Sequence, residues 1–225
     1  QEAAPQRLDD AVLRWMGEHR VPWAEAAMVE ITLLGTGIVV MMTVVVAGVF
    51  LWLTEHRFSA LLLVIATWGG VAINMVLKAT FDRPRPQVFE WGTHVLTSSF
   101  PSGHAMSATI VYGTVPYLAA RLQRPRATRW ATLAAAALLI FLICASRLYL
   151  GVHYPSDVVA GVVMGVAWST FCMAVLEGVQ VFGRRNRPQI LGHIGRHTAN
   201  FCRIIDKQPA QRIDRRFAFH RNAAG

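Results

Sequence analysis

The sequence predicts an all-α fold, a polytopic bundle of membrane-spanning helices preceded by an amphipathic helix. The chain has 225 residues, of which 54% are hydrophobic and only 16% are charged. It also contains apolar runs close to the ~20 residues that a helix needs to cross a bilayer. We place five spans, at residues 29–53, 58–79, 104–120, 130–146 and 158–182, of which the third and fourth are short.

The spans divide the chain into an N-terminal segment (1–27), a membrane-embedded domain (28–182) and a basic tail (183–225). The N-terminal segment carries residues at helical spacing that form one face: Leu8, Ala11, Val12, Trp15, Met16 and His19. A helix lying in the membrane interface and a short soluble helix both fit this pattern. Pro22 then ends or redirects the helix.

The distribution of Arg in the short connections predicts the orientation of the chain. The connection 121–129 carries four Arg and no acidic residue, so it should lie in the cytoplasm. Successive spans cross the membrane in opposite directions. Residues 55–57 and the tail should therefore lie in the cytoplasm, and residues 80–102 and 148–157 on the outer, periplasmic side of the inner (plasma) membrane. The N-terminal segment also falls outside, so we expect one more span upstream of Gln1 and six spans in the full-length chain.

The net charge of +9 is concentrated in the tail. Residues 183–225 hold ten Lys and Arg against two Asp. A basic tail beside a span favours contact with anionic lipid headgroups, and no recognition-helix or aromatic-interleaved pattern favours nucleic acid. Cys144, Cys172 and Cys202 are spaced neither as a disulfide framework nor as a metal knuckle.

Residues 146–157, Ser-Arg-Leu-Tyr-Leu-Gly-Val-His-Tyr-Pro-Ser-Asp, place chemically active side chains between two spans. Pro155 suits the first turn of a helix, so Asp157 would lie at a helix start and reach back to the imidazole of His153. A carboxylate there fixes the tautomer and makes the other ring nitrogen a nucleophile. A polar loop with a structural histidine is the alternative.

Residues 78–86, Lys-Ala-Thr-Phe-Asp-Arg-Pro-Arg-Pro, follow the second span. Two prolines keep the residues before them extended, so Arg83 and Arg85 project from a stiff segment. A guanidinium suits bidentate phosphate binding, with Lys78 as a point charge. The alternative for Lys78 is a side chain that extends to the lipid headgroups.

Residues 99–105, Ser-Phe-Pro-Ser-Gly-His-Ala, precede the third span. Ser102 and Gly103 would put free backbone amides and a hydroxyl at the start of a helix, which is an anion site. His104 would lie on the first turn, within reach of the bound anion. A simple helix cap with a histidine at headgroup level is the alternative.

The three stretches together resemble the type 2 phosphatidic acid phosphatase superfamily, which includes bacterial membrane lipid phosphatases and vanadium haloperoxidases. The first family motif, Lys, six residues and Arg-Pro, falls on 78–86, and the second, Pro-Ser-Gly-His, on 101–104. The third, Ser-Arg, five residues, His, three residues and Asp, falls on 146–157. Every motif position is matched, and the resemblance covers residues 8–182 but not the tail.

The resemblance implies that His153 attacks phosphorus to give a phosphohistidine while Asp157 holds its ring. His104 would protonate the departing oxygen and then take a proton from the attacking water. The phosphate oxygens would be neutralised by five residues: Lys78, Arg85, Ser102, Gly103 and Arg147.

We therefore expect no cofactor and no divalent metal, because these cations and amides do the work of a metal in many phosphoryl-transfer sites. The carboxylates of Asp82, Glu90 and Asp157 are also too dispersed for a two-metal cluster.

The sequence thus favours an outer-face phosphatase acting on a lipid phosphate or pyrophosphate. By resemblance, its candidate substrates are phosphatidic acid, phosphatidylglycerol phosphate and undecaprenyl pyrophosphate. A phosphotransferase would use the same phosphohistidine but pass the group to a hydroxyl acceptor. A haloperoxidase is disfavoured by the run of spans, and a non-catalytic lipid-binding or transport module by the presence of both His104 and His153.

Overall fold

The computed structural model describes residues 4–87 and 97–206, with side chains described within 6–87 and 97–181. The described residues form helices and no strand. The helices are α1 (Ala4–Glu18), α2 (Pro22–Leu33), α3 (Gly37–Leu53), α4 (Arg57–Phe81), α5 (Gly103–Leu122), α6 (Arg126–Tyr149) and α7 (Pro155–Asp206). The chain separates into two compact units, Gln1–Leu176 and Glu177–Gly225, and the features below belong to the first.

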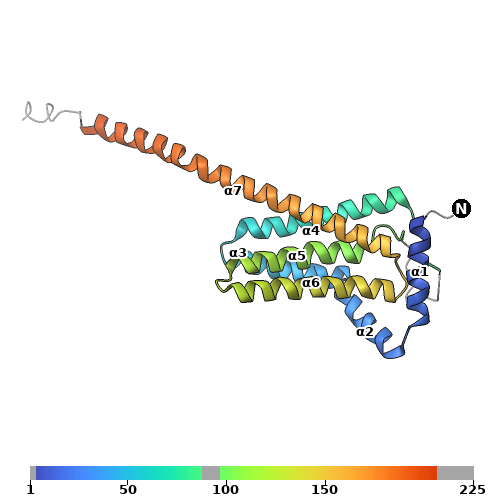
Figure 1. Cartoon of the computed structure of the whole chain (residues 1–225). Coiled ribbons are helices and arrows are strands. Elements are labelled where there is room, and N and C mark those ends of the chain that lie inside the picture. Colours follow the sequence, from blue (N-terminus) through green and yellow to red (C-terminus); the bar gives the residue numbers. More distant parts are fainter. Residues whose placement is uncertain (1–3, 88–96, 207–225) are drawn as a thin grey trace, which may run out of the picture. The chain divides into compact units, whose positions relative to one another are not determined.

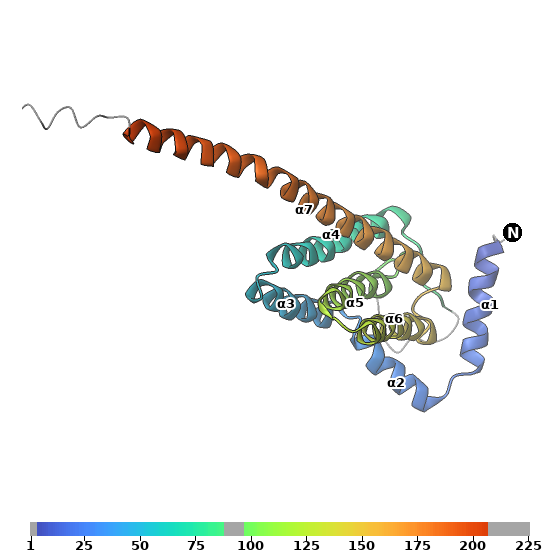
Figure 2. The same cartoon turned by 60° about the vertical axis from the view of Figure 1, so that its left-hand side comes forward.

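Helix α5 lies at the centre of the first unit, against α3, α4 and α6 (Figures 1 and 2). Half of its residues are buried, including Ile110 and Val111, which pack with Leu63 and Ile143 in the main apolar core. The hydroxyl of Thr109 is also buried and donates to the Ala105 carbonyl at 2.7 Å. The central helix can therefore carry a buried hydroxyl whose hydrogen bond is made to its own backbone.

Among the residues that the structure describes, three helices are long and apolar enough to cross a membrane: α4, α6 and the Pro155–Val181 part of α7. Helices α2 and α3 together make a fourth candidate. Large apolar side chains such as Ile38, Trp68 and Phe141 point outward, as expected for surfaces that face lipid. The protein is therefore a multi-pass membrane protein.

Helix α5 coincides with the predicted third span but is not among these candidates. Its neighbours rather than lipid surround much of it, which allows it to carry polar residues. The number of five spans therefore remains a prediction, as does the placement of α1 in the membrane interface.

The predicted span 29–53 is not one straight helix. It comprises the end of α2 and all of α3, which are bent by 45° at residues 34–36. The sequence there, Leu34-Gly35-Thr36 followed by Gly37, combines two glycines with the Thr36 N-cap of α3. The segment 29–53 is apolar on both sides of the bend, so the hydropathy pattern did not predict it.

Helix α7 begins at Pro155, as predicted, and remains helical to Asp206, beyond the predicted end of the last span at 182. The predicted contact of the tail with anionic lipid depends on side chains outside the described residues. Helix α1 lies across the end of the bundle where α4 ends and α7 begins (Figure 1).

Gly161 and Gly165 lie where α7 approaches α5 most closely. A Cβ at Gly161 would meet the Ser102 carbonyl oxygen at 2.7 Å, and one at Gly165 would meet Thr109 Cβ at 2.8 Å. Small residues at four-residue spacing permit this contact. The packing sets the position of Ser102, the first residue before α5.

Replacing Gly161 with Ala should therefore lower the turnover of the expected phosphatase reaction by about 10- to 100-fold. The added methyl would displace the start of α5 and, with it, the candidate residues Ser102 and His104. Steady-state kinetics of the purified variant measures this. Gly113→Ala on α5 is the matched control, since no atom lies within 4 Å of its added Cβ. Equal activity of the two variants would contradict the packing argument.

Candidate active site

The residues of the three motifs converge at one end of the first unit. Lys78 lies in the last turn of α4 and Arg147 in the last turn of α6. His104 lies in the first turn of α5, His153 in the loop between α6 and α7, and Asp157 in the first turn of α7. The prediction that both polar loops share one face is confirmed, because Arg85 of one donates to the Val152 carbonyl of the other at 2.7 Å.

His153 is held between a carboxylate and a guanidinium. Its Nδ1 lies 3.7 Å from Asp157 Oδ2, longer than a hydrogen bond, and its Nε2 lies 3.4 Å from Arg85 Nη1. Only 2% of the residue is exposed. Burial, helped by Arg147 and Arg85 and opposed by Asp157, lowers the pKa of His153 to about 4. The ring is therefore neutral at pH 7, with Nε2 directed towards the cations.

The Asp157 carboxylate is fully buried and each of its oxygens has its own partners. Oδ1 accepts from Arg83 Nη1 at 2.6 Å, and Oδ2 accepts from the Tyr154 amide at 3.0 Å. The sequence placed Arg83 on the same stiff segment as Arg85 but assigned only Arg85 to phosphate. The structure directs Arg83 towards Asp157.

Three cations lie close to His104, two of them, Arg85 and Arg147, also to His153, and each cation is positioned by a neighbouring oxygen. Arg85 Nε donates to the Thr97 carbonyl at 2.8 Å, Lys78 Nζ donates to the Ser98 carbonyl, and Arg147 donates to Thr32. Arg85 also has a lowered pKa because it is partly buried.

Three buried polar atoms of these motifs make no hydrogen bond: His104 Nε2, Arg147 Nε and His153 Nδ1. Buried polar groups normally have partners. His153 Nδ1 faces Asp157, whereas His104 Nε2 and Arg147 Nε belong to side chains grouped with Lys78 and Arg85, which fits an anionic ligand.

The start of α5 differs from the predicted anion site, in which Ser102 and Gly103 both offer free donors. The Ser102 hydroxyl accepts from the Ala105 amide at 3.4 Å as the N-cap, and the Ser102 amide donates to the Asp157 carbonyl at 3.0 Å. The amide is thus occupied by α7. Gly103, the first residue of α5, has no intrahelical acceptor for its amide and remains a donor for an anion.

The bend between α2 and α3 contacts two residues of the motifs, Arg147 and His104. The sequence did not predict these contacts. Thr32 accepts from Arg147 Nη1 at 2.7 Å. A Cβ at Gly35 would lie 3.0 Å from His104 Cδ2, so the backbone of the bend packs directly on that imidazole. In the sequence, the two glycines of Gly35-Thr36-Gly37 could have indicated the bend.

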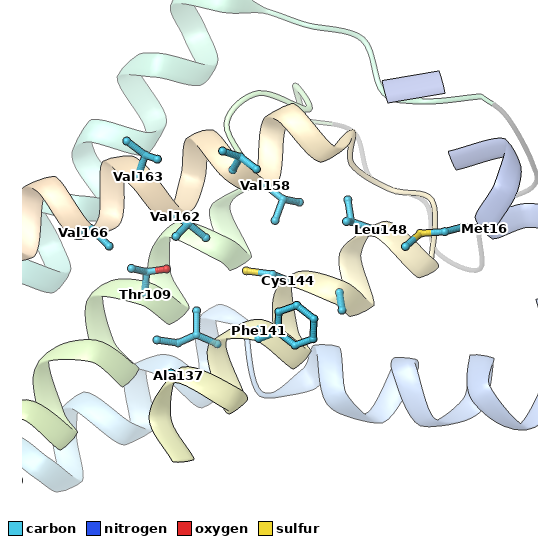
Figure 3. Close-up of a pocket in the computed structure, with 13 residues that line it drawn as sticks. Met16, Thr109, Ala137, Phe141, Cys144, Leu148, Val158, Val162, Val163 and Val166 are labelled. Carbon is cyan, nitrogen blue, oxygen red and sulfur yellow. The ribbon is translucent and has the colours of Figure 1, made fainter. Parts of the chain in front are cut away.

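An apolar groove of about 610 Å³ lies between α6 and α7 (Figure 3). Phe141, Cys144 and Leu148 line it from α6, and Val158 and Val162 from α7. Two of these lining residues, Cys144 and Val158, pack in a small apolar cluster with the buried Ala105. The groove therefore adjoins the apolar packing around the first turns of α5 and α7.

Comparison with known proteins matches residues 57–180 to the family model of the PAP2 superfamily. This stretch is more than half of the chain and contains all three motifs. The chain belongs to the PAP2 superfamily. The resemblance inferred from the motifs is confirmed.

Several relatives are named as phosphatases. The chain is 31% identical over 164 residues to phosphatidylglycerophosphatase B of Bacillus subtilis, covering 72% of this chain and 80% of the relative. It is 39% identical over 112 residues to decaprenylphosphoryl-5-phosphoribose phosphatase of Mycobacterium tuberculosis, covering 48% of this chain and 56% of that protein.

The fold is also similar to a solved structure, a transmembrane PAP2-type phosphatidylglycerolphosphate phosphatase from Bacillus subtilis. The two have a TM-score of 0.74 and 28% sequence identity, over 80% of this chain and 89% of the other. The PAP2 relatives support a membrane-embedded lipid phosphatase as the class of this protein.

Proposed function

We propose that this protein hydrolyses a lipid phosphate or pyrophosphate through a phosphohistidine at His153. The convergence of Lys78, Arg85 and Arg147 on the two histidines, with His153 a neutral, buried imidazole, supports this most directly. Such a cluster stabilises the charge of the equatorial oxygens in a phosphoryl-transfer transition state.

In the proposed first step, His153 Nε2 attacks phosphorus as the bond to the leaving oxygen breaks. Asp157 stabilises the proton on Nδ1, and the 3.7 Å separation shortens when the ring becomes charged. His104 donates its proton to the leaving oxygen. In the second step His104 takes a proton from water, which attacks phosphorus, breaks the bond to Nε2 and releases inorganic phosphate.

The apolar groove behind the motifs supports a lipid substrate. Its size falls within the range of small-molecule sites, and its one hydroxyl, that of Thr109, already donates to the helix backbone. Hydrocarbon is therefore the chemistry that it suits. Candidate substrates are phosphatidic acid, phosphatidylglycerol phosphate and undecaprenyl pyrophosphate.

A panel of these purified lipids in detergent tests the proposal. Inorganic phosphate should be released from at least one of them, and release should persist in excess chelator because Lys78, Arg85 and Arg147 supply the positive charge. Release only after addition of a hydroxyl acceptor would favour a phosphotransferase. No phosphate release from any lipid would contradict the proposal.

The pKa of His153 predicts the acid side of the pH profile. Four groups face this imidazole: Asp157, Arg85, Arg147 and His104. Because its pKa lies at about 4 rather than 6.5, the free enzyme keeps a neutral nucleophile between pH 5 and pH 7.

Nitrogen NMR of histidine-labelled protein in micelles measures this directly, with His153→Gln used to assign the signal. The signal should titrate well below pH 6.5. Protonation near pH 6.5 would mean that burial does not control the nucleophile, independently of any ionisation of the substrate.

We also propose that the site faces the periplasm or cell exterior and that the basic tail contacts anionic lipid in the cytoplasm. With Cys144, Cys172 and Cys202 replaced, Gln87→Cys in intact cells should react with a membrane-impermeant maleimide and Thr128→Cys should not. Both positions are exposed in the structure. The expected difference follows from the Arg-rich 121–129 connection, which resists translocation. The reverse labelling pattern would place the site in the cytoplasm.

A further inference from the structure

We propose that Arg83 and Asp9 form a positioning pair for Asp157, so that helix α1 is part of the catalytic arrangement. The inference rests on the proposed function of His153 and Asp157. Neither Arg83 nor Asp9 touches the open side of His153, and the three motifs include neither as an assigned position.

Arg83 bridges two buried carboxylates. Its Nη1 donates to Asp157 Oδ1 at 2.6 Å and its Nη2 to Asp9 Oδ2 at 2.9 Å. The guanidinium also lies over the Tyr154 ring, 4.2 Å from its centroid. One face and both terminal nitrogens of the planar group are therefore occupied, which fixes its orientation.

Asp9 joins α1 to the start of α7. Its Oδ1 accepts from the Ser156 amide at 3.0 Å, and its Oδ2 also accepts from the Ser156 hydroxyl. The Ser156 amide is one of the unpaired donors in the first turn of α7, so a carboxylate from another helix acts as its cap. The Asp9 side chain is only 6% exposed.

These contacts determine which oxygen Asp157 offers to His153. Arg83 occupies Oδ1, which leaves Oδ2 to face His153 Nδ1. Without Arg83 the carboxylate could rotate or bind the imidazolium with both oxygens. Without Asp9 the guanidinium would lose its second anchor, and α7 would lose a cap one residue before Asp157.

The variants Arg83→Lys and Asp9→Asn test the pair kinetically in the full chain. Lys keeps the charge but has no fork to span two carboxylates, so kcat should fall by about 10- to 100-fold. KM should change by less than about threefold, because Arg83 does not contact substrate in this arrangement. Asp9→Asn should lower kcat in the same direction.

Glu18→Gln is the matched control. It removes a carboxylate charge from an exposed position at the other end of α1. Its kcat should remain within about twofold of the parent, as for an exposed charge outside the network.

A second readout separates positioning from simple stabilisation of the fold. In Arg83→Gln, Asp157 is freed for His153 and a nearby cation is lost, so the pKa of His153 should rise by about one unit. In Asp9→Asn the cation remains, so that pKa should not rise. Histidine NMR measures both, and thermal unfolding in detergent identifies variants that merely fail to fold.

Unchanged kcat in folded Arg83→Lys and Asp9→Asn would overturn the inference. A fall in kcat that follows thermal stability, with the pKa of His153 unaltered in Arg83→Gln, would also overturn it, because the pair would then only secure α1. A parent protein that releases phosphate from no lipid would instead contradict the proposed function. The pKa of His153 measured by NMR would still test whether Arg83 and Asp9 position Asp157.

Discussion

Replacement of His153 by Gln should abolish both turnover and the phosphorylated intermediate. Removing a nucleophile that acts together with its neighbours typically costs at least about 10⁴-fold in kcat. Gln retains much of the volume of the imidazole but has no nucleophilic nitrogen, so the protein should still fold. Lys78, Arg85 and Arg147 should still bind the phosphate, and KM or inhibition by inorganic phosphate should change little.

Rapid acid-free quenching with radiolabelled lipid phosphate measures the intermediate. The parent should trap label that survives alkali and is lost in acid, as expected of a phosphorylated imidazole. His56→Gln is the control, because His56 is exposed at the opposite end of the bundle, before α4. Labelled protein in His153→Gln would assign the nucleophile to another residue.

The residues that converge could be predicted because each motif lies at the end of a helix. A span of fixed length sets the depth of the residue that follows it, so Lys78, His104 and Asp157 were expected at one level of the bundle. Pro155 and Ser102 marked two of these helix starts in the sequence.

The supports of the site could not be predicted, because they depend on how helices rotate and bend. Arg83 and Asp9 are 74 positions apart, and nothing local distinguishes Asp9 from Asp10 on a helix with polar residues on several sides. Thr32 reaches Arg147 only because the chain bends at 34–36. Hydropathy records whether a segment is apolar, but not where it changes direction.

The same contacts hold the reacting groups of the site in place. Arg83 and the α7 cap position Asp157, the Gly35 backbone packs on the His104 ring, and the Thr97 carbonyl positions Arg85. Two of the three motif atoms without partners, His104 Nε2 and His153 Nδ1, are those to which the mechanism assigns protons. Preorganised groups of this kind need little rearrangement when charge develops.

Replacement of His104 by Asn should affect substrates according to their leaving group. An alkyl phosphate leaves as a strongly basic alkoxide, so loss of the acid should slow the first step by about 10²- to 10⁴-fold. An aryl phosphate leaves as a weakly basic phenolate and needs little protonation. Its first step should therefore remain fast, whereas the second step still lacks the base that activates water.

The His104→Asn variant should consequently give a burst of phenolate close to one equivalent, followed by slow turnover with accumulated phosphohistidine. Stopped-flow absorbance measures the burst and label trapping measures the intermediate. His153→Gln should give no burst, which makes it the control for the same assay. Equal losses for alkyl and aryl phosphates, with no accumulated intermediate, would mean that His104 transfers no proton and only binds the phosphate beside the Gly35 bend.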